Sequence, residues 1–351
     1  MSQQATEPSA PTITYPFDAP EPGQRIEVAP GVHWIRLPLP FRLDHINVWA
    51  LQDEDGWSLV DTGIRTPQTV QAWETLTAAG PLSAPLHRVL VTHMHPDHIG
   101  LAGWFTRRSG ATLHISRLEY LMCRSLTGDT GREPPPDALR FYREAGWGEA
   151  ALEAYAARFG SFGNHIYALP DSFRRLSDGQ RLRIGRHEWE VVIGAGHSPE
   201  HACLYCAELK LFISGDQVLP RISSNVSVQP LEPEANPMRD WLDSLDRIRR
   251  RVPDDVLVLP SHNKCFRGLH ERIDALLQGQ HEALQRLHAA LATPARAVDV
   301  FKALFKRDIP QTDASQLGMA TGEAVACLNH LLAQGRIQAE LRDGVRWYRA
   351  A

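Results

Sequence analysis

The sequence has no run of about 18 consecutive apolar residues, the length that a membrane-spanning helix needs. It has no strong excess of either charge, because 37 Lys and Arg residues face 41 Asp and Glu residues. A net charge of −4 gives no overall positive field that would recruit nucleic acid. Cysteine is scarce, and an odd total of five indicates free thiols in a reducing compartment, so we expect a cytoplasmic protein. The N-terminus has neither a basic segment nor an apolar core, so we expect no secretory signal peptide.

The rest of the composition is that of a globular protein. Apolar residues make up 43% and charged residues 22% of the 351 residues, which is enough apolar material for a sizeable core. This length predicts two domains, or one large domain with an appendage. Residues 1–24 contain five prolines and show no helical or strand period, so we expect a flexible N-terminal arm. From 25 to 265, short apolar runs alternate with helical patterns, which predicts one α/β domain.

Two segments stand apart from this alternation. Residues 103–165 are too long for a simple connection, so we expect two or three helices inserted there over one face of the domain. Residues 266–351 contain leucine-rich helical stretches and then the segments 336–341 and 345–349 around Asp343-Gly344, which predicts a helical linker, further helices and a β-hairpin. This order is the winged-helix pattern. Residues 296–351 hold eight basic and six acidic residues, which favours a packing or dimerisation module over a nucleic-acid-binding one.

The unusual feature is a cluster of histidines in the segment VTHMHPDHIG. It places His93, His95, Asp97 and His98 within six positions. Burying such side chains without partners is costly, and clustering them increases that cost. A bound cation offsets it, and imidazole and carboxylate ligands suit zinc, iron or manganese. The preceding residues 87–92 have the pattern of a buried strand, so the cluster falls on the loop after that strand.

Three later segments repeat this layout of an apolar strand, a turn and one polar side chain. WEVVIGAGH ends at His197, LKLFISGD ends at Asp216, and VLVLPSH ends at His262. Each segment alone is weak, because a single polar residue after a strand usually caps that strand. Together with the histidine cluster, four strand ends that all carry candidate ligands indicate one metal site at a sheet edge.

This combination of H-x-H-x-D-H, Gly-His, Gly-Asp and a last His resembles the metallo-β-lactamase superfamily, over residues 25 to about 265. The resemblance implies an αββα sandwich with a two-metal site at one edge, and two Zn²⁺ per chain, with Fe or Mn as alternatives. The C-terminal pattern resembles the winged-helix extension of the branch that contains β-lactamase-like protein 2. By position, the resemblance assigns one metal to His93, His95 and His197, the second metal to Asp97, His98 and His262, and a bridging role to Asp216.

Two positions separate branches of this superfamily. The flavodiiron branch has Glu where this sequence has His95, which favours hydrolysis over oxygen chemistry. True β-lactamases usually have Cys where this sequence has Asp216, which points to the glyoxalase II, lactonase and nuclease branches. In such a site two metals share a water and lower its pKa toward about 7. Asp97 and Asp216 are the expected catalytic carboxylates, and Asp97 is a candidate to guide the proton of that water.

We therefore expect a binuclear hydrolase in which a metal-bridging hydroxide attacks a small acyl substrate, a thioester or a lactone. The alternative is a metal-dependent endoribonuclease or phosphodiesterase, which would need a basic track leading to the metals. A metal-bound regulatory module is a third hypothesis, which the complete ligand set disfavours. The expected partners are a small-molecule substrate and a second copy of the chain; nucleic acid is disfavoured and no membrane partner is expected.

Several neighbours of the ligands also carry expectations. Asp61, in LVDTG, is expected to support the ligand loop, and His201 to lie outside the ligand set. Cys203 and Cys206 are three apart in a predicted strand, so their side chains should point to opposite faces as core cysteines. Ser261 stands where many relatives have Gly before the last His, and it requires a negative φ there.

Overall fold

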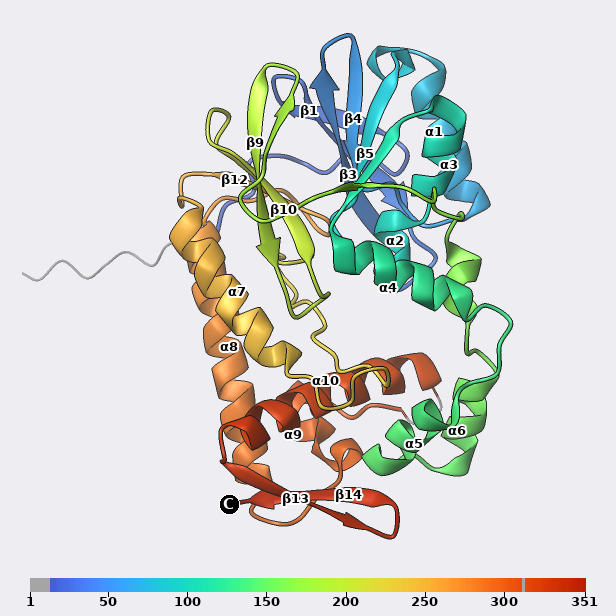
Figure 1. Cartoon of the computed structure of the whole chain (residues 1–351). Helices are drawn as coiled ribbons and strands as arrows, with labels where there is room; N and C mark the ends of the chain where they lie inside the picture. Colours follow the sequence, from blue (N-terminus) through green and yellow to red (C-terminus); the bar gives the residue numbers. More distant parts are fainter. Residues whose placement is uncertain (1–12, 311–312) are drawn as a thin grey trace, which may run out of the picture.

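The computed structural model describes residues 13–310 and 313–351, and its centre is a pair of facing β-sheets (Figure 1). The first sheet has seven strands in the order β1-β2-β3-β4-β5-β6-β7. Its first four strands pair antiparallel, and β4 to β7 pair parallel. The strands are β1 (Arg25–Ala29), β2 (Val32–Pro38), β3 (His45–Asp53), β4 (Gly56–Val60), β5 (Leu86–Leu90), β6 (Thr112–Ile115) and β7 (Arg174–Arg175).

The second sheet has five strands in the order β12-β11-β10-β9-β8. The pair β11 and β12 is parallel, and the other neighbours are antiparallel, so β9, β11 and β12 all run in the same direction. The strands are β8 (Arg181–Ile184), β9 (His187–Gly194), β10 (His201–Cys206), β11 (Leu211–Gly215) and β12 (Leu257–Pro260).

Three apolar layers hold this arrangement together. Between the sheets, Trp34 and Trp49 stack with ring centroids 6.0 Å apart and share a cluster with Trp189 of the second sheet. On the outer face of the first sheet lie α1 (Pro67–Ala78) and α3 (Ala102–Ser109), whose Trp73 and Phe105 pack edge to face at 4.9 Å. The outer face of the second sheet is covered by α7 (Pro237–Arg251) and α8 (Leu269–Ala290). The predicted αββα sandwich is therefore confirmed.

The helices begin where local chemistry favours them. Thr66 caps α1 by accepting a hydrogen bond from the Thr69 amide, and Pro67 occupies the first helical position, where its missing N–H costs nothing. Asn236 and Pro237 repeat the same arrangement at the start of α7. The sequence therefore determines the start of these two helices locally, while apolar burial fixes their orientation.

An insertion follows β6 and consists of α4 (Arg117–Gly128), α5 (Pro136–Ala145) and α6 (Glu149–Ala156). Only α4 stays beside the sandwich; α5 and α6 lie beside the C-terminal helices (Figure 1). The Trp147 indole N–H after α5 donates to the Thr321 hydroxyl at 2.9 Å, and Arg346 pairs with Glu144 at 2.9 Å. Helices α5 and α6 thus join the C-terminal segment. The expected insertion over residues 103–165 began too early, because α3 and β6 belong to the sandwich.

The C-terminal segment contains α9 (Phe301–Phe305), α10 (Ala314–Ala333) and a hairpin of β13 (Ile337–Arg342) and β14 (Val345–Ala350). Asp343 and Gly344 form its turn with φ values of 49° and 77°, so the predicted two-residue hairpin is confirmed.

At the other end of the chain, residues 1–12 of the predicted arm lie outside the described part. Thr14 forms a backbone bridge with Arg267. Among residues 13–310 and 313–351, no helix has the length and apolar character needed to cross a bilayer.

Candidate metal centre

The seven predicted ligands all lie at the carboxyl ends of strands, along one edge of the sandwich. The loop after β5 carries His93 and His95, and the short helix α2 (Pro96–Ile99) carries Asp97 and His98. In the second sheet, β9, β11 and β12 run in the same direction and are followed by the other three ligands. The strand-end pattern predicted from the sequence therefore brings all seven side chains together: His93, His95, Asp97, His98, His197, Asp216 and His262.

Their ligand atoms form three overlapping groups. Within each group, one ligand atom from every residue lies within 4.8 Å of the others. The outer two groups correspond to the two metal sites that the resemblance implies, and the middle group joins them. The groups are His93, His95 and His197; His93, His98 and Asp216; and Asp97, His98 and His262.

Asp216 lies between the two outer groups with one oxygen toward each. Its Oδ2 is 3.4 Å from Nε2 of His197. Its Oδ1 is 3.6 Å from Nε2 of His98 and 3.5 Å from Nε2 of His262. A carboxylate placed this way can share one oxygen with each of two cations.

The ligand atoms of the site are placed to bind cations, and two of them lack hydrogen-bond partners among the described residues. Nε2 of His98 and Oδ1 of Asp216 are both fully buried, and neither has a hydrogen-bond partner in the described part of the chain. Buried polar atoms without partners are costly in free energy, and a cation between them removes that cost. Nε2 of His93 also lies 2.9 Å from Nδ1 of His95 and 3.3 Å from Nε2 of His197. Divalent metals with nitrogen and oxygen ligands therefore match this site.

Hydrogen bonds at the opposite ring nitrogens orient the imidazoles. Nδ1 of His197 donates to the Asn225 carbonyl at 2.7 Å, and Nδ1 of His262 donates to the His45 carbonyl at 2.9 Å. Because a carbonyl oxygen can only accept, each of these rings carries its proton on Nδ1. In the neutral form of either ring, Nε2 therefore carries the lone pair and faces the centre of the site.

Asp61 supports the ligand loop, as the sequence predicted. Its carboxylate accepts the Thr92 amide at 2.8 Å, the Thr92 hydroxyl at 2.7 Å and Nδ1 of His98 at 2.7 Å. Its backbone has φ of 62°, in the left-handed region that non-glycine residues adopt infrequently. These three hydrogen bonds hold both the backbone of the loop and the ring of one ligand, and they offset the cost of that conformation.

Burial and neighbouring charges set the protonation of the ligands. Burial lowers the pKa of His95 to about 3 and that of His93 well below its usual value, so both rings are neutral. Burial alone would raise the pKa of Asp97, but His98 and His262 outweigh it and lower that pKa to about 2. Burial would lower the pKa of His262, yet Asp216 and Asp97 raise it to about 10. The imidazoles of His93 and His95 are therefore neutral, while the carboxylate of Asp97 is ionised.

Glu119 was missed by the sequence analysis. It lies fully buried in the first turn of α4, where its carboxylate accepts the Met94 amide at 2.9 Å and the Glu200 amide at 2.8 Å. It thereby joins the loop of His95 to the loop that follows His197. The only local signal is an acidic residue in the first turn of a helix, and that signal is too common to single it out.

Close backbone packing surrounds two of the ligands. Gly215, just before Asp216, has φ of 53°, and a Cβ there would lie 2.3 Å from the His201 ring. The ring of His201 in turn accepts the Asp216 amide at 3.0 Å, so His201 lies behind the ligands as expected. Ser261 keeps a negative φ, since it is not among the residues with positive values, and this fulfils the condition for a side chain there.

The two cysteines of the C-x-x-C segment lie on opposite faces of β10. Cys203 joins the cluster under α7 and α8, and Cys206 joins the cluster between the sheets. Both are free and buried, and burial raises the pKa of both thiols. The prediction of core cysteines is confirmed.

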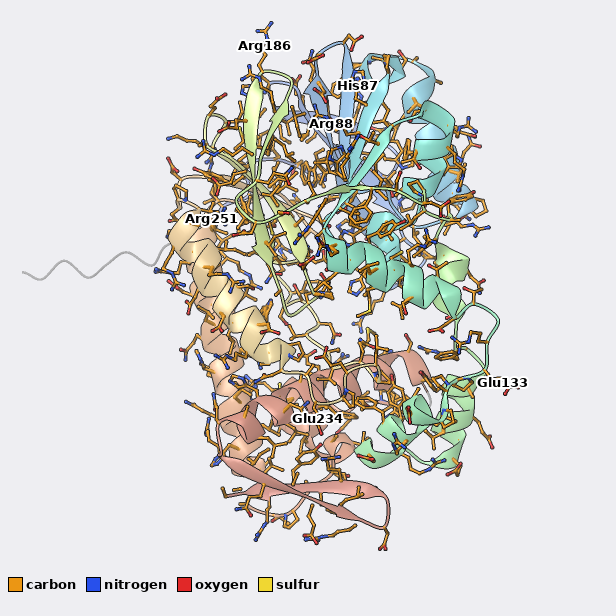
Figure 2. The ribbon with its side chains drawn as sticks, viewed as in Figure 1. His87, Arg88, Glu133, Arg186, Glu234 and Arg251 are labelled. Carbon is orange, nitrogen blue, oxygen red and sulfur yellow. The ribbon has the colours of Figure 1, made fainter. Side chains whose placement is uncertain are left out.

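A separate cavity of about 500 Å³ lies away from the ligands, between α5, α10, β14 and the segment 230–234. Its lining includes Arg140, Glu144 and Leu231, and none of the seven ligands. Glu234, in the same segment, is visible beside α10 (Figure 2).

Comparison with known proteins places the chain in a family. Residues 42–262 match the Metallo-beta-lactamase superfamily, and residues 284–351 match the Metallo-beta-lactamase-like, C-terminal domain. The first match covers more than half of the chain, so the chain belongs to the metallo-beta-lactamase superfamily. This membership supports a hydrolase that binds divalent metal.

Individual relatives resemble between two thirds and almost all of the chain. A solved beta-lactamase domain protein from Burkholderia ambifaria is 39% identical with a TM-score of 0.87, over 97% of this chain and 98% of that one. Probable metallo-hydrolase YqjP of Bacillus subtilis (strain 168) is 23% identical over 86% of this chain and 92% of that protein. Atrochrysone carboxyl ACP thioesterase of Aspergillus fumigatus is 26% identical over 67% of this chain, but only 41% of that protein is covered.

Proposed function

We propose that the chain is a binuclear metal-dependent hydrolase of a small acyl substrate, a thioester or a lactone, with two Zn²⁺ as its metals. The observation that carries this proposal is Asp216, whose two oxygens face two separate groups of ligand atoms. We assign the first metal to His93, His95 and His197 and the second to Asp97, His98 and His262, with Asp216 shared.

Two bound divalent metals supply a hydroxide nucleophile at neutral pH and a Lewis acid for the substrate oxygen. The chain provides rigid, mostly neutral donors on one side of the site and ionised carboxylates on the other. Oδ2 of Asp97 lies 3.5 Å from Nε2 of His262 and 3.7 Å from Nε2 of His98. We assign Asp97 the additional role of accepting a hydrogen bond from the attacking water at a carboxylate oxygen and thereby orienting it.

Exposed apolar side chains on the helices next to the site favour an acyl substrate. Leu118 and Leu121 of α4 are 46% and 53% exposed, on either side of the Glu119 that contacts the ligand loops. Met319 of α10 is 51% exposed, and its carbonyl accepts from Asn225. Large exposed apolar side chains on helices that contact the ligand loops suit an apolar substrate portion better than a phosphate backbone.

Three basic residues that the sequence offered for a nucleic-acid track have partners within the chain. Lys264, next to His262 in sequence, pairs with Asp18 at 2.8 Å, and the Arg221 guanidinium lies over the Tyr15 ring. Arg251, at the end of α7 (Figure 2), pairs with Asp178 at 2.7 Å. Lys264 and Arg251 are paired with carboxylates and are therefore less able to bind phosphate, which supports acyl hydrolysis over the nuclease alternative.

The test is hydrolysis by zinc-loaded protein, with and without chelator, on one panel of thioesters, lactones, phosphodiesters and short RNA. We expect turnover of a thioester or a lactone that chelator abolishes and zinc restores. Cleavage of phosphodiester or RNA alone would replace this proposal with the nuclease alternative.

A further inference from the structure

One face of α10 contacts the segment that follows Asp216. The Asn225 side-chain amide donates to Oε2 of Glu323 at 2.7 Å and to the Met319 carbonyl at 3.4 Å. The Val228 amide donates to the Gly322 carbonyl at 3.0 Å. Residues almost one hundred positions apart are therefore joined by backbone and side-chain hydrogen bonds.

The same segment holds a metal-site histidine. The Asn225 carbonyl is the acceptor for Nδ1 of His197, at 2.7 Å. The Asn225 side-chain oxygen accepts in turn from the Ser227 hydroxyl at 2.6 Å. Asn225 is thus held by Glu323 and Ser227 through its side chain while its backbone orients His197.

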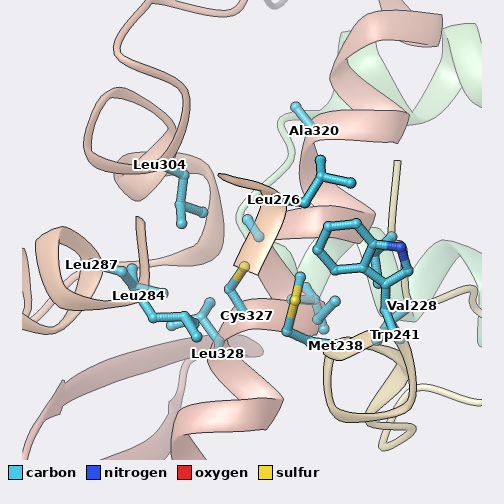
Figure 3. Close-up of a cluster of buried hydrophobic side chains, with 14 of the residues drawn as sticks. Val228, Met238, Trp241, Leu276, Leu284, Leu287, Leu304, Ala320, Cys327 and Leu328 are labelled. Atoms are coloured by element: carbon cyan, nitrogen blue, oxygen red, sulfur yellow. The ribbon is translucent and has the colours of Figure 1, made fainter. Parts of the chain in front are cut away.

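Helix α10 packs closely against the segment that contains Asn225. A Cβ on Gly322 would lie 2.8 Å from the Ser227 side chain, so the helix approaches the segment more closely than any larger residue permits. Next to it, Val228 lies in the same buried cluster as Ala320 and Cys327 of α10 and Leu276 of α8 (Figure 3). The apolar cluster fixes α10, and α10 then fixes the segment.

We propose that α10 is part of the metal centre, with Glu323 a positioning residue that acts through Asn225 to hold His197 at the first metal. This inference rests on the proposed two-metal function. It gives the C-terminal segment a specific role, which is to support His197 at the first metal. In the described part of the chain, the polar contacts of Asp97, His98 and His262, which we assign to the second metal, include Asp61, the His45 carbonyl and one another, and none is with α10. Partners that orient ligands in this way change metal affinity about 10- to 100-fold when removed.

The experiment is a competition titration of the full-length protein with a coloured chelator, which gives the affinity of each of the two zinc ions. For Glu323→Ala we expect about 10-fold weaker binding of one zinc and unchanged binding of the other. Glu323→Gln keeps an oxygen that accepts from Asn225 and should restore wild-type affinity within about threefold. As the matched control, Glu340→Ala removes an exposed carboxylate from β13 and should change neither zinc.

Gly322→Ala gives a second, independent perturbation, because its methyl group would press on Ser227. We expect the same selective loss of one zinc. Equal weakening of both zinc ions, or no change in either variant while the wild type binds two, would overturn the inference and leave the proposed function intact. A wild-type protein that binds no zinc would overturn both.

Discussion

At the scale of single residues, hydrogen bonds behind the metal site determine which ring nitrogen faces it. The carbonyls of His45 and Asn225 each accept an imidazole N–H and leave Nε2 free for a metal. Asp216 differs from these histidines, because both of its carboxylate oxygens face ligand groups.

Asp216→Ala should therefore remove most bound metal and activity while leaving the fold intact. The alanine methyl group fits in the space of the carboxylate, but each metal loses the Asp216 oxygen that would bind it. Metal content by mass spectrometry and circular dichroism check this outcome. Asp137→Ala, which removes an exposed carboxylate from α5, is the control. Two retained metals with near-normal turnover would disprove the bridging role.

Asp61→Asn tests the support of the ligand loop. Asn tolerates the left-handed φ of 62° and nearly preserves the shape of the side chain, but it removes the charge that His98 and Thr92 contact. We expect about 10- to 100-fold weaker metal binding with a thermal midpoint lowered by only a few degrees. Wild-type metal affinity would show that Asp61 is only a turn residue.

At the scale of elements, the local part of the site was predictable from the sequence and the long-range part was not. Strand-end motifs revealed all seven candidate ligands, because four of them follow one apolar run and each of the other three follows a run of its own. Glu119 and Glu323 carry no such signal, since the partners of Glu119 lie 25 and 81 positions away and that of Glu323 lies 98 positions away. Strands β7 and β8 also escaped, because β7 has only two residues and both strands are rich in arginine instead of forming an apolar run.

Two glycines provide a matched pair for testing the backbone near Asp216. Gly215→Ala should destabilise the protein by about 2–4 kcal/mol, because its Cβ would overlap the His201 ring at a positive φ. Gly279→Ala lies in the middle of α8 with open space around it and should stabilise by about 0.5–1 kcal/mol. Urea denaturation measures both. Equal effects would mean that the close approach at Gly215 does not constrain the fold.

Glu323 should make stability depend on pH. Burial raises its pKa to about 7, against an opposing hydrogen bond from Asn225, and the thiol of Cys327 is its buried titratable neighbour. A raised pKa means that this group stabilises the fold at low pH and that the contribution is lost as pH rises through about 7. The urea midpoint should therefore fall between pH 6 and pH 8.5.

A variant measured over the same pH range distinguishes the contribution of Glu323 from that of other titrating groups. Glu323→Gln cannot ionise, so its urea midpoint should fall less than that of the wild type between pH 6 and pH 8.5. Identical pH profiles for the two proteins would contradict the assignment.

At the scale of the whole molecule, one apolar cluster extends from the second sheet through α7 and α8 to α10 and the insertion helices. Deleting residues 295–351 would expose the apolar faces of α8, α7 and α5 that α10 and β14 cover. We expect poorly soluble protein, measured by the soluble fraction and by light scattering. A well-behaved truncated monomer with full activity would show that the segment is dispensable.

The central claim is that one edge of the sandwich holds two metals with Asp216 between them. Anomalous diffraction from crystals of zinc-loaded protein, collected above the zinc absorption edge, tests it directly. We predict two peaks about 3.5–4 Å apart, one beside His93, His95 and His197 and one beside Asp97, His98 and His262, with a carboxylate oxygen of Asp216 at each. A single peak, or peaks away from Asp216, would contradict the account.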